Sequence, residues 1–379
     1  MNEKNLMIVA GEVSGDLHGS FLMKELKALD SKLNIFGIGG DRMISEGMNV
    51  NFHISNMAFL GFVEVIKHIP FIKRVQKELL EIIVENKIKV VVLIDYPGFN
   101  LNFAKKLREL NIKVIYYISP QIWAWGKGRI KKIKTYVDKM IVVFPFEEKI
   151  FKHENINVDF VGHPLLDVLR DYKFLSKEEV YEKFNLDEEK EILLLLPGSR
   201  KHEVQTILPE MMKAAEKLSE KFNFQIIVSA SPNIGMDFFS NVIDIKSFKV
   251  IRGYTYDLMR YSKFGIIKSG TSTLEAAIFE LPMVIVYKTS HVTYIIGKSL
   301  IKLKKIGMAN IIVGENVVPE LIQNNLTENK IYSEAEKILL DKNLYAGIKN
   351  KLAGVKEKLG NEGASKKAAK LIYGIMNEA

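Results

Sequence analysis

Short apolar runs recur along this chain of 379 residues, and turns and stretches of helical periodicity separate them. Residues 90–94 are entirely apolar, a pattern typical of a strand buried on both faces of a parallel sheet. The same pattern predicts strands at residues 6–10, 34–38, 113–118, 140–144, 158–161, 192–196, 225–229, 248–251, 264–267 and 283–287. Helices are predicted between them, for example at about residues 17–29 and 203–220. Strands that alternate with helices in this way predict an α/β fold with parallel sheets.

A charged stretch divides this pattern into two halves. Residues 167–191 are rich in polar and charged side chains, and the strand–turn–helix order resumes after them. The chain is long for one α/β domain, and each half is large enough to form its own core. We therefore expect two doubly wound domains with their boundary in this stretch, and a helical region after residue 320.

The turn after the predicted strand 264–267 is a candidate phosphate site. Its residues are Ser269, Gly270, Thr271, Ser272 and Thr273. Backbone N–H groups at the start of a helix bind anions, and a glycine lets a ligand approach closely. Glu275, one helical turn later, is a candidate acceptor for ribose hydroxyls. The same residues also fit an ordinary capped helix, which remains the alternative.

A second turn of this kind lies earlier in the same half. Residues 197–200 read Pro-Gly-Ser-Arg, between the strand 192–196 and the helix 203–220. An arginine in a strand-to-helix turn can hold a phosphate group bidentately. Ser199 and Arg200 are therefore candidate phosphate ligands.

Acidic side chains follow two strands of the first half. Residues 11–16, Gly-Glu-Val-Ser-Gly-Asp, follow the first strand, and their two acids, Glu12 and Asp16, favour sugar hydroxyls or proton transfer over a phosphate. Asp95 follows the strand 90–94, at the carboxyl edge where ligands of open α/β sheets bind. Asp95 is a candidate general base, with a helix N-cap as the alternative. Glu12 and Asp16 are its rivals.

Two stretches combine apolar or aromatic residues with positive charge. Residues 57–74 are almost continuously apolar up to Lys73 and Arg74, which fits an interfacial segment or a core helix. Within this stretch Phe71 and Ile72 are candidates for membrane contact. Trp123 and Trp125, the only tryptophans, precede a basic run at residues 127–134. Such a pair could stack on bases or sit at a membrane interface, and a solvated helix with buried rings is the alternative.

Composition narrows the partners and the chemistry. The net charge of +9 indicates anionic partners, and the absence of cysteine suits a reducing cytoplasm and excludes a thiol nucleophile. The apolar run near the start has the pattern of neither a signal peptide nor a membrane span. The seven histidines are scattered, and no Asp-x-Asp or Walker A sequence occurs. We therefore predict neither a metal site nor a cofactor.

The set of motifs resembles one family, the lipid-A-disaccharide synthases, which are GT-B glycosyltransferases. The resemblance runs from about residue 7 to residue 323 and rests on motifs in the same order and spacing. These motifs are residues 11–16, 119–125, 196–204 and 269–275, together with 61–65, 145–147, 162–164 and Asn310. Gly98 departs from the pattern, because some relatives have an acid there.

The resemblance implies an inverting glycosyltransferase. It would move 2,3-diacylglucosamine from UDP-2,3-diacylglucosamine to the 6-hydroxyl of 2,3-diacylglucosamine 1-phosphate, giving a β-1,6-linked disaccharide and UDP. It implies a GT-B fold of two Rossmann-like domains that face a central cleft. Residues 1–168 would bind the acceptor and contact the membrane, residues 169–355 would bind the UDP-sugar, and a helix at 356–379 would return to the first domain.

The resemblance also suggests roles for individual residues. Asn310 would join the UDP site. Ser14, Gly15, Trp123 and Trp125 would lie on the acceptor and lipid side. The protein would be cytoplasmic and peripherally attached to the cytoplasmic leaflet of the inner membrane, without a nucleic-acid partner. Whether it forms a homodimer stays open.

Three other functions compete with this one. A UDP-N-acetylglucosamine 2-epimerase or an undecaprenyl-linked transferase would share the fold and the nucleotide site. The tryptophan segment and the acidic turn at residues 11–16 favour the lipid enzyme over both. A non-enzymatic scaffold that binds RNA or membranes through charge is the third, but no basic–aromatic RNA-binding module occurs.

Overall fold

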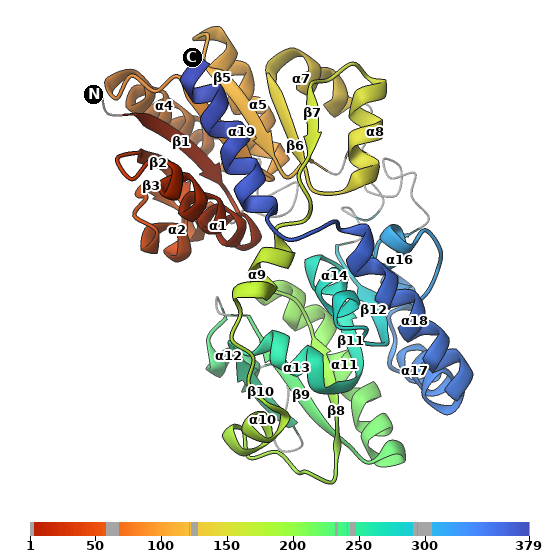
Figure 1. Ribbon diagram of the computed structural model, residues 1–379. Helices are drawn as coiled ribbons and strands as arrows, with labels where there is room; N and C mark the ends of the chain where they lie inside the picture. Colours follow the sequence, from red (N-terminus) through yellow and green to blue (C-terminus); the bar gives the residue numbers. More distant parts are fainter. Residues whose placement is uncertain are drawn as a thin grey trace. The chain divides into compact units, whose positions relative to one another are not determined.

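The computed structural model describes residues 4–57, 68–120, 122, 128–231, 234–240, 242, 248–290, 294 and 305–378. These residues form two compact units. The described residues of the first unit lie within Met1–Tyr172 and Leu359–Ala379, and those of the second within Lys173–Ile295 and Leu303–Lys358. Each unit is built on one parallel sheet with helices packed against it (Figure 1).

The first sheet contains, in the described residues, seven parallel strands in the order β3-β2-β1-β4-β5-β6-β7. Their bounds are β1 (Asn5–Ala10), β2 (Asn34–Gly39), β3 (Asn49–His53), β4 (Val90–Ile94), β5 (Lys113–Tyr117), β6 (Lys139–Val142) and β7 (Val158–Phe160). The helices of this unit are α1 (Val13–Leu29), α2 (Asp41–Ser45), α4 (Ile69–Glu85), α5 (Pro97–Glu109), α7 (Gly128–Tyr136), α8 (Pro145–His153), α9 (Leu165–Asp171) and α19 (Ala364–Glu378). Apolar side chains of α4, α5, α7 and α8 share one core with alternate residues of the strands, such as Met7 and Val9.

The second sheet has the order β10-β9-β8-β11-β12-β13, again with all described strands parallel. The bounds are β8 (Glu191–Leu196), β9 (Phe224–Ala230), β10 (Phe248–Arg252), β11 (Ser262–Lys268), β12 (Met283–Tyr287) and β13 (Glu320–Ile322). The helices of this unit are α10 (Lys177–Lys183), α11 (Lys201–Phe222), α12 (Met236–Ser240), α13 (Thr255–Tyr261), α14 (Thr271–Ile278), α16 (Met308–Val313), α17 (Glu328–Leu340) and α18 (Lys342–Lys358).

Each sheet reverses its strand order at one point, and this is where open α/β sheets bind ligands. In the first unit β1 pairs with β4, with Ala10 opposite Ile94 at the carboxyl edge. In the second unit β8 pairs with β11, with Leu196 opposite Ile267. The turns after these four strands are the ones that carry the predicted site residues.

The apolar runs located all the predicted strands, and two further strands were missed. β3 has the sequence NVNFH and β13 only ELI, so neither forms an apolar run. The start of α1 was also placed too late: the helix begins at Val13 rather than near Leu17. Gly15 lies in its first turn, where a side chain would press on Ala10. The second glycine of the predicted turn thus allows close packing of helix on strand.

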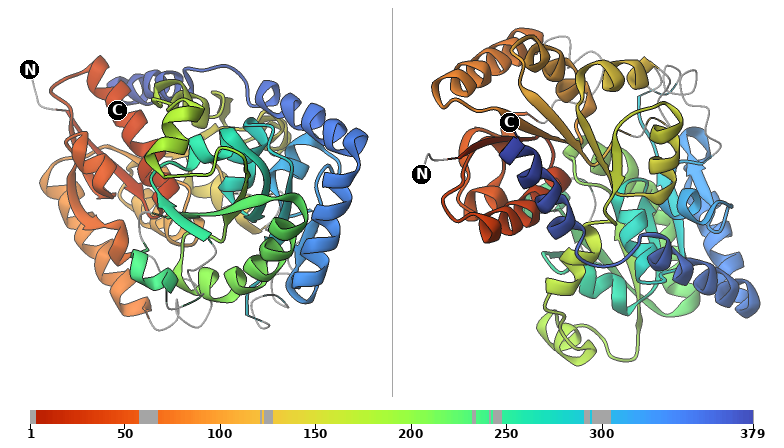
Figure 2. Two further views of the ribbon diagram at one scale, coloured as in Figure 1. Left: turned by 90° about the horizontal axis from the view of Figure 1, so that it is seen from below. Right: turned by 45° about the horizontal axis from the view of Figure 1, so that its top comes forward.

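The last helix belongs to the first unit. α19 lies beside α1, as Figures 1 and 2 both show. The buried carboxylate of Asp167, in α9, accepts hydrogen bonds from the backbone N–H groups of Gly363 (2.5 Å) and Ser365 (2.8 Å). It therefore caps the N-terminus of α19, which otherwise would leave these donors unpaired. At the other end of the helix, Lys4 bonds to Tyr373 and Asn377.

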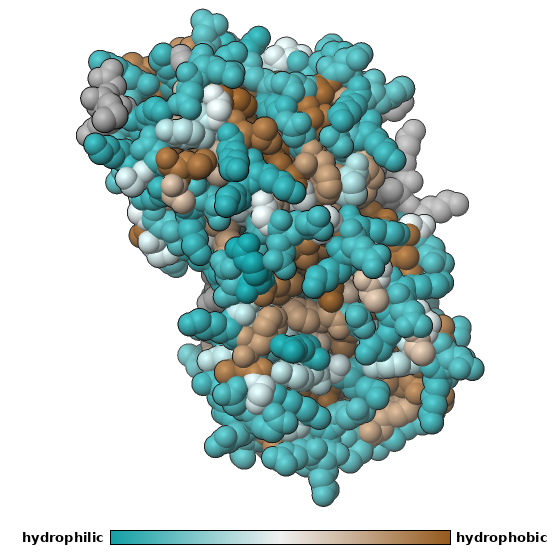
Figure 3. All heavy atoms as spheres, in the orientation of Figure 1, coloured by the Kyte–Doolittle hydropathy of each residue, from teal (hydrophilic) through white to brown (hydrophobic). Residues whose placement is uncertain are grey.

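The surface is largely polar. On the face drawn in Figure 3, hydrophilic side chains cover most of the area and smaller apolar areas lie between them. None of the helices formed by the described residues combines the length and the apolar character needed to cross a bilayer.

We predict that Asp167→Ala loosens α19. Two backbone donors at the helix start lose their acceptor in a buried place, which should lower the free energy of unfolding by about 1–3 kcal/mol. Hydrogen exchange should become faster in α19, and denaturant titration gives the free energy. Asp171→Ala is the control, because its partly exposed carboxylate pairs with Arg170 and Lys24 and should contribute about 1 kcal/mol or less. Equal effects of the two substitutions would contradict the capping role.

Candidate active site

The backbone at the end of β4 adopts a rare conformation. Asp95 and Tyr96 both have a φ of 45°, in the left-handed region that residues other than glycine seldom occupy. Two side chains hold this turn in place. The Asn100 amide donates hydrogen bonds to the carbonyl oxygens of Ile94 (3.1 Å) and Asp95 (2.8 Å), and the Tyr116 hydroxyl donates to that of Asp95. Strain that the surroundings maintain in this way is a frequent sign of a functional site.

The Asp95 carboxyl group is the first candidate for acid–base chemistry. Burial raises its pKa from the usual 3.8 to about 7, and the nearby charge of Glu12 raises it further. A hydrogen bond from the Tyr96 backbone N–H and the charge of Arg129 act in the opposite direction. Asp95 is not the N-cap of α5, the alternative considered from the sequence, because that position belongs to Tyr96. A carboxyl group with a pKa near neutrality can both accept and release a proton.

Glu12 lies at the N-cap position of α1, on the neighbouring strand end, and is partly buried. The preceding Gly11 is in close contact with Tyr96: a Cβ at residue 11 would stand 2.2 Å from the tyrosine ring. The Tyr96 hydroxyl in turn donates to the carbonyl oxygen of Met57 (2.9 Å). Gly11 is therefore needed for the turns after β1 and β4 to pack together, which brings Glu12 and Asp95 into one site.

Asp16, the third acidic candidate, has a different environment. Its side chain is 4% exposed, and its oxygens accept backbone N–H groups of Gly40 (2.7 Å), Met43 (3.1 Å) and Arg42 (3.2 Å). The carboxylate thus holds the turn after β2 and caps α2. The sequence suggested contact with a substrate, whereas all the recorded bonds of this carboxylate stay within the protein.

Other side chains around Asp95 were not selected from the sequence. Arg129 of α7 and Glu147 of α8 both act on the charge of Asp95. The buried Glu147 also accepts a hydrogen bond from the Ser119 hydroxyl (2.5 Å). Of the residues predicted on the acceptor side, Ser14 and Gly15 lie in the first turn of α1. Trp123 and Trp125 lie outside the described residues.

In the second unit, the small residues after β11 divide into two groups. The Ser269 hydroxyl donates to the carbonyl oxygen of Ile306 (2.9 Å). The Thr273 hydroxyl donates to the carbonyl oxygen of Gly270 (2.8 Å) and accepts from the backbone N–H of Met308 (3.0 Å). These two hydroxyls therefore hold the segment before α16. Gly270 and Thr271 are exposed and Ser272 is partly exposed, so these three can reach a ligand.

Glu275 is the second carboxyl group whose pKa is raised to about 7, and burial is the main cause. The Tyr256 hydroxyl donates to it (3.2 Å), and Ser272 also bonds to it. The group lies in the middle of α14, in the next turn after the exposed residues. Its oxygens can accept hydrogen bonds from hydroxyl groups of a ligand.

Arg200 and Ser199 belong to a cluster centred on the buried carboxylate of Glu203. That carboxylate accepts from the Ser199 backbone N–H (3.3 Å) and pairs with Arg200 (3.3 Å) and with Lys268 (2.8 Å). Burial alone would raise the pKa of Glu203, but the two cations lower it overall. Gly198, at φ +121°, makes the turn that brings these groups together. Lys268 was not singled out from the sequence, because it ends a strand.

Asn310 is fully engaged by the protein. Its amide group donates to the carbonyl oxygen of Val318 and to Glu320 (both 2.8 Å), and its oxygen accepts from Val317 (2.8 Å) and Val318 (3.0 Å). Since all four hydrogen-bonding positions are used, this side chain orders the segment between α16 and β13 rather than offering a free donor.

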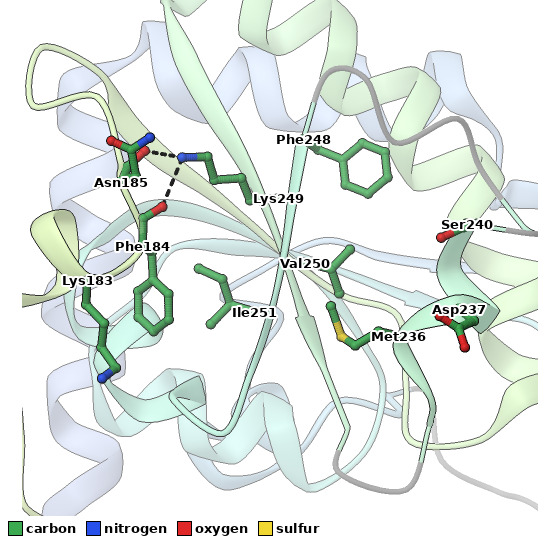
Figure 4. Close-up of a pocket in the computed structure, with 10 residues that line it drawn as sticks. All are labelled: Lys183, Phe184, Asn185, Met236, Asp237, Ser240, Phe248, Lys249, Val250 and Ile251. Atoms are coloured by element: carbon green, nitrogen blue, oxygen red, sulfur yellow. Dashed lines mark hydrogen bonds between the residues drawn. The ribbon is translucent and has the colours of Figure 1, made fainter.

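Two further features bear on the search for a site. A cavity of about 530 Å³ lies beside the edge strand β10, but Lys249, one of its basic residues, already donates to the carbonyl oxygens of Phe184 and Asn185 (Figure 4). The structure also places His18 edge-on to His163, with ring centroids 5.9 Å apart, although the sequence showed only scattered histidines. Within the described ranges, no three acidic or histidine side chains gather as metal ligands would.

Curated relatives match this chain over nearly its whole length. A lipid-A-disaccharide synthase from Geobacter sulfurreducens is 40% identical over 376 residues, covering 98% of this chain and 97% of the relative. One from Coxiella burnetii is 38% identical over 377 residues, covering 99% and 100%.

Solved structures show the fold. An S. aureus MnaA–UDP complex has a TM-score of 0.69 at 13% identity and covers 99% of this chain and 98% of its own. A UDP-GlcNAc 2-epimerase from Neisseria meningitidis, bound to UDP-GlcNAc, has a TM-score of 0.68 at 12% identity and covers 98% and 100%. A glycosyltransferase from Rickettsia africae has a TM-score of 0.55 at 15% identity, with full coverage of both chains. At such low identity these likenesses show a GT-B fold and no more.

The family is decided by sequence. The family model described as lipid-A-disaccharide synthetase matches residues 6–373. Because that match spans both units and the curated relatives reach 40% identity, the chain belongs to the lipid-A-disaccharide synthetase family.

Proposed function

We propose that this chain transfers 2,3-diacylglucosamine from UDP-2,3-diacylglucosamine to the 6-hydroxyl of 2,3-diacylglucosamine 1-phosphate. The products are the β-1,6-linked disaccharide 1-phosphate and UDP. Membership of the family supports this reaction. The observation that carries the chemistry is the raised pKa of the Asp95 carboxyl group, in a strained turn at the strand-order reversal of the first sheet.

In the proposed step Asp95 acts as the general base. Its carboxylate takes the proton of the acceptor 6-hydroxyl while that oxygen attacks the anomeric carbon of the donor. The bond from this carbon to the diphosphate oxygen breaks, and UDP leaves with its electron pair. A base with a pKa of about 7 is half deprotonated at neutral pH and still basic enough to accept the proton.

The neighbouring acids have supporting roles in this scheme. The charge of Glu12 helps to keep the Asp95 pKa high, and its carboxylate can also accept hydroxyls of the acceptor sugar. Asp16 holds the turn after β2 through three backbone N–H groups. We therefore prefer Asp95 to both as the base.

The second unit would bind the nucleotide. The exposed start of α14, at Gly270 and Thr271, offers backbone N–H groups to a diphosphate. Arg200, partly exposed at the start of α11, offers a guanidinium group to the same diphosphate. Glu275 would accept the ribose hydroxyls. Positive potential at the leaving group lowers the barrier, because negative charge develops there in the transition state.

Acylated substrates require contact with a membrane, and α4 offers a suitable surface at its N-terminal end. Ile69 is 41% exposed, and Lys73, Arg74 and Lys77 are exposed on the next turns. An apolar residue beside several positive charges is the pattern of a peripheral membrane contact. Phe71, a candidate from the sequence, is partly buried against the core of the first unit, as is Ile72. Peripheral attachment to an anionic leaflet is therefore proposed through Ile69 and the lysines.

The reaction can be tested with the two acylated substrates and mass spectrometry of the lipid product. We predict that Asp95→Asn lowers single-turnover disaccharide formation by roughly 10²–10⁴-fold, because an amide cannot accept the proton. Binding of UDP, measured by calorimetry, should stay unchanged, because the nucleotide is held by the second unit.

The amide variants of the rival acids serve as matched comparisons. Glu12→Gln should reduce turnover less than Asp95→Asn, and Asp16→Asn should act mainly on stability. Near-normal turnover in Asp95→Asn together with its loss in Glu12→Gln would move the base to the turn after β1. Absence of any disaccharide from the wild-type protein would refute the proposed reaction.

For the membrane surface, we predict that Ile69→Ser combined with Lys73→Gln and Lys77→Gln weakens binding to phosphatidylglycerol vesicles by about 10-fold or more. Each lysine near an anionic surface contributes on the order of 1 kcal/mol. The melting temperature should stay within about 2 °C of the wild type, because exposed substitutions change stability little. Vesicle flotation and thermal unfolding give the two readouts.

Val84→Ser is the matched control for this surface. Val84 is 66% exposed at the other end of the same helix, so its replacement removes exposed apolar area without touching the proposed contact. If the triple variant floats with vesicles as well as the wild type does, α4 is not the membrane contact.

A further inference from the structure

Lys268 is a cation held in a largely buried position beside the proposed diphosphate site. It is the last residue of β11, and its side chain is 15% exposed. Its ammonium group lies 2.8 Å from the Glu203 carboxylate. The same nitrogen lies 3.9 Å from the position that a Cβ would take at Gly270. The charge therefore stands at the exposed turn that begins α14.

Glu203 fixes this position from below. Its carboxylate, 7% exposed, binds three groups at once: the Ser199 backbone N–H, the Arg200 guanidinium and the Lys268 ammonium. Lys268 also lies over the Tyr287 ring, 5.6 Å from its centre. Two cations against one carboxylate leave one positive charge in the cluster, between the turns that follow β8 and β11.

Such a cluster is preorganised for an anion. A free lysine must give up rotamer freedom before it binds a phosphate, whereas the Lys268 side chain is already ordered by Glu203 and Tyr287. The ammonium group has three N–H donors, so one bond to Glu203 leaves donors for other acceptors. The low exposure of the cluster strengthens its interaction with a phosphate.

We propose that Lys268 binds the diphosphate of the UDP-sugar directly, with Glu203 as the residue that positions it. This inference rests on the proposed function and adds a residue to its nucleotide site. As the bond from sugar to diphosphate breaks, Lys268 and Arg200 share the negative charge that develops on the departing UDP. Glu203 touches neither substrate nor product and acts through these two cations.

A purely structural role is the competing explanation, and the two can be separated. If Lys268 served only to neutralise Glu203, its removal would matter only while residue 203 is charged. Glu203→Gln should then restore a Lys268→Met protein to the behaviour of Glu203→Gln alone. If Lys268 binds the diphosphate, the loss should persist in the double variant.

The experiment is calorimetric titration with UDP, and ligand-observed NMR with uridine, which lacks the diphosphate. Lys268→Met should weaken UDP binding by about 10- to 100-fold, the effect of losing one charge-assisted bond. Uridine binding should remain as in the wild type. The double variant Lys268→Met/Glu203→Gln should bind UDP at least about 10-fold more weakly than Glu203→Gln does.

Lys263→Met is the matched control, since Lys263 lies at the opposite end of the same strand and pairs with Glu191 at the surface. It should leave UDP affinity unchanged. Equal UDP affinity of the double variant and Glu203→Gln would overturn the proposal, as would equal losses of UDP and uridine binding in Lys268→Met. Wild-type affinity in Lys268→Met would overturn this inference alone, whereas a wild-type protein that binds no UDP would overturn the proposed function as well.

Discussion

The proposed chemistry depends on one constraint, the left-handed backbone of Asp95 and Tyr96 at the end of β4. An extended continuation of the strand would carry Asp95 along the sheet edge. The left-handed turn places its carboxyl group among protein atoms and beside Glu12, and loss of hydration together with that charge raises its pKa. Asn100 and Tyr116 bond to the carbonyl oxygens of this turn, and Gly11 leaves room for the Tyr96 ring.

The second unit uses the same topology for a different charge. Its strand-order reversal also lies between two adjacent parallel strands, β8 and β11. Here the turns carry Arg200, Lys268 and an exposed helix start, with Glu203 as the shared anchor. One sheet thus presents carboxyl groups at its reversal and the other presents positive charge. An inverting transfer needs both, a base for the acceptor and stabilisation for the leaving group.

Much of the fold could be predicted because parallel strands buried on both faces have continuous apolar sequences, as in β4 and β8. The polar edge strand β3 and the three-residue β13 have no such pattern. The turns that carry candidate residues were also found, since they follow these strands. The roles of single residues were harder to predict, because they depend on distant partners. Asp16 bonds to Gly40, and Asn310 bonds to Val318 and Glu320. Lys268 gains its importance only when folding brings it to Glu203.

The most direct test of the account is the protonation state of Asp95 itself. A ¹³C NMR titration of the protein with labelled aspartate, with the resonance assigned by its absence in Asp95→Asn, measures that pKa without any substrate. The account predicts a midpoint near pH 7, where burial and Glu12 place it. A midpoint near 4, the ordinary value for an exposed aspartate, would mean that the turn does not create a base, and the proposed role of Asp95 would be contradicted.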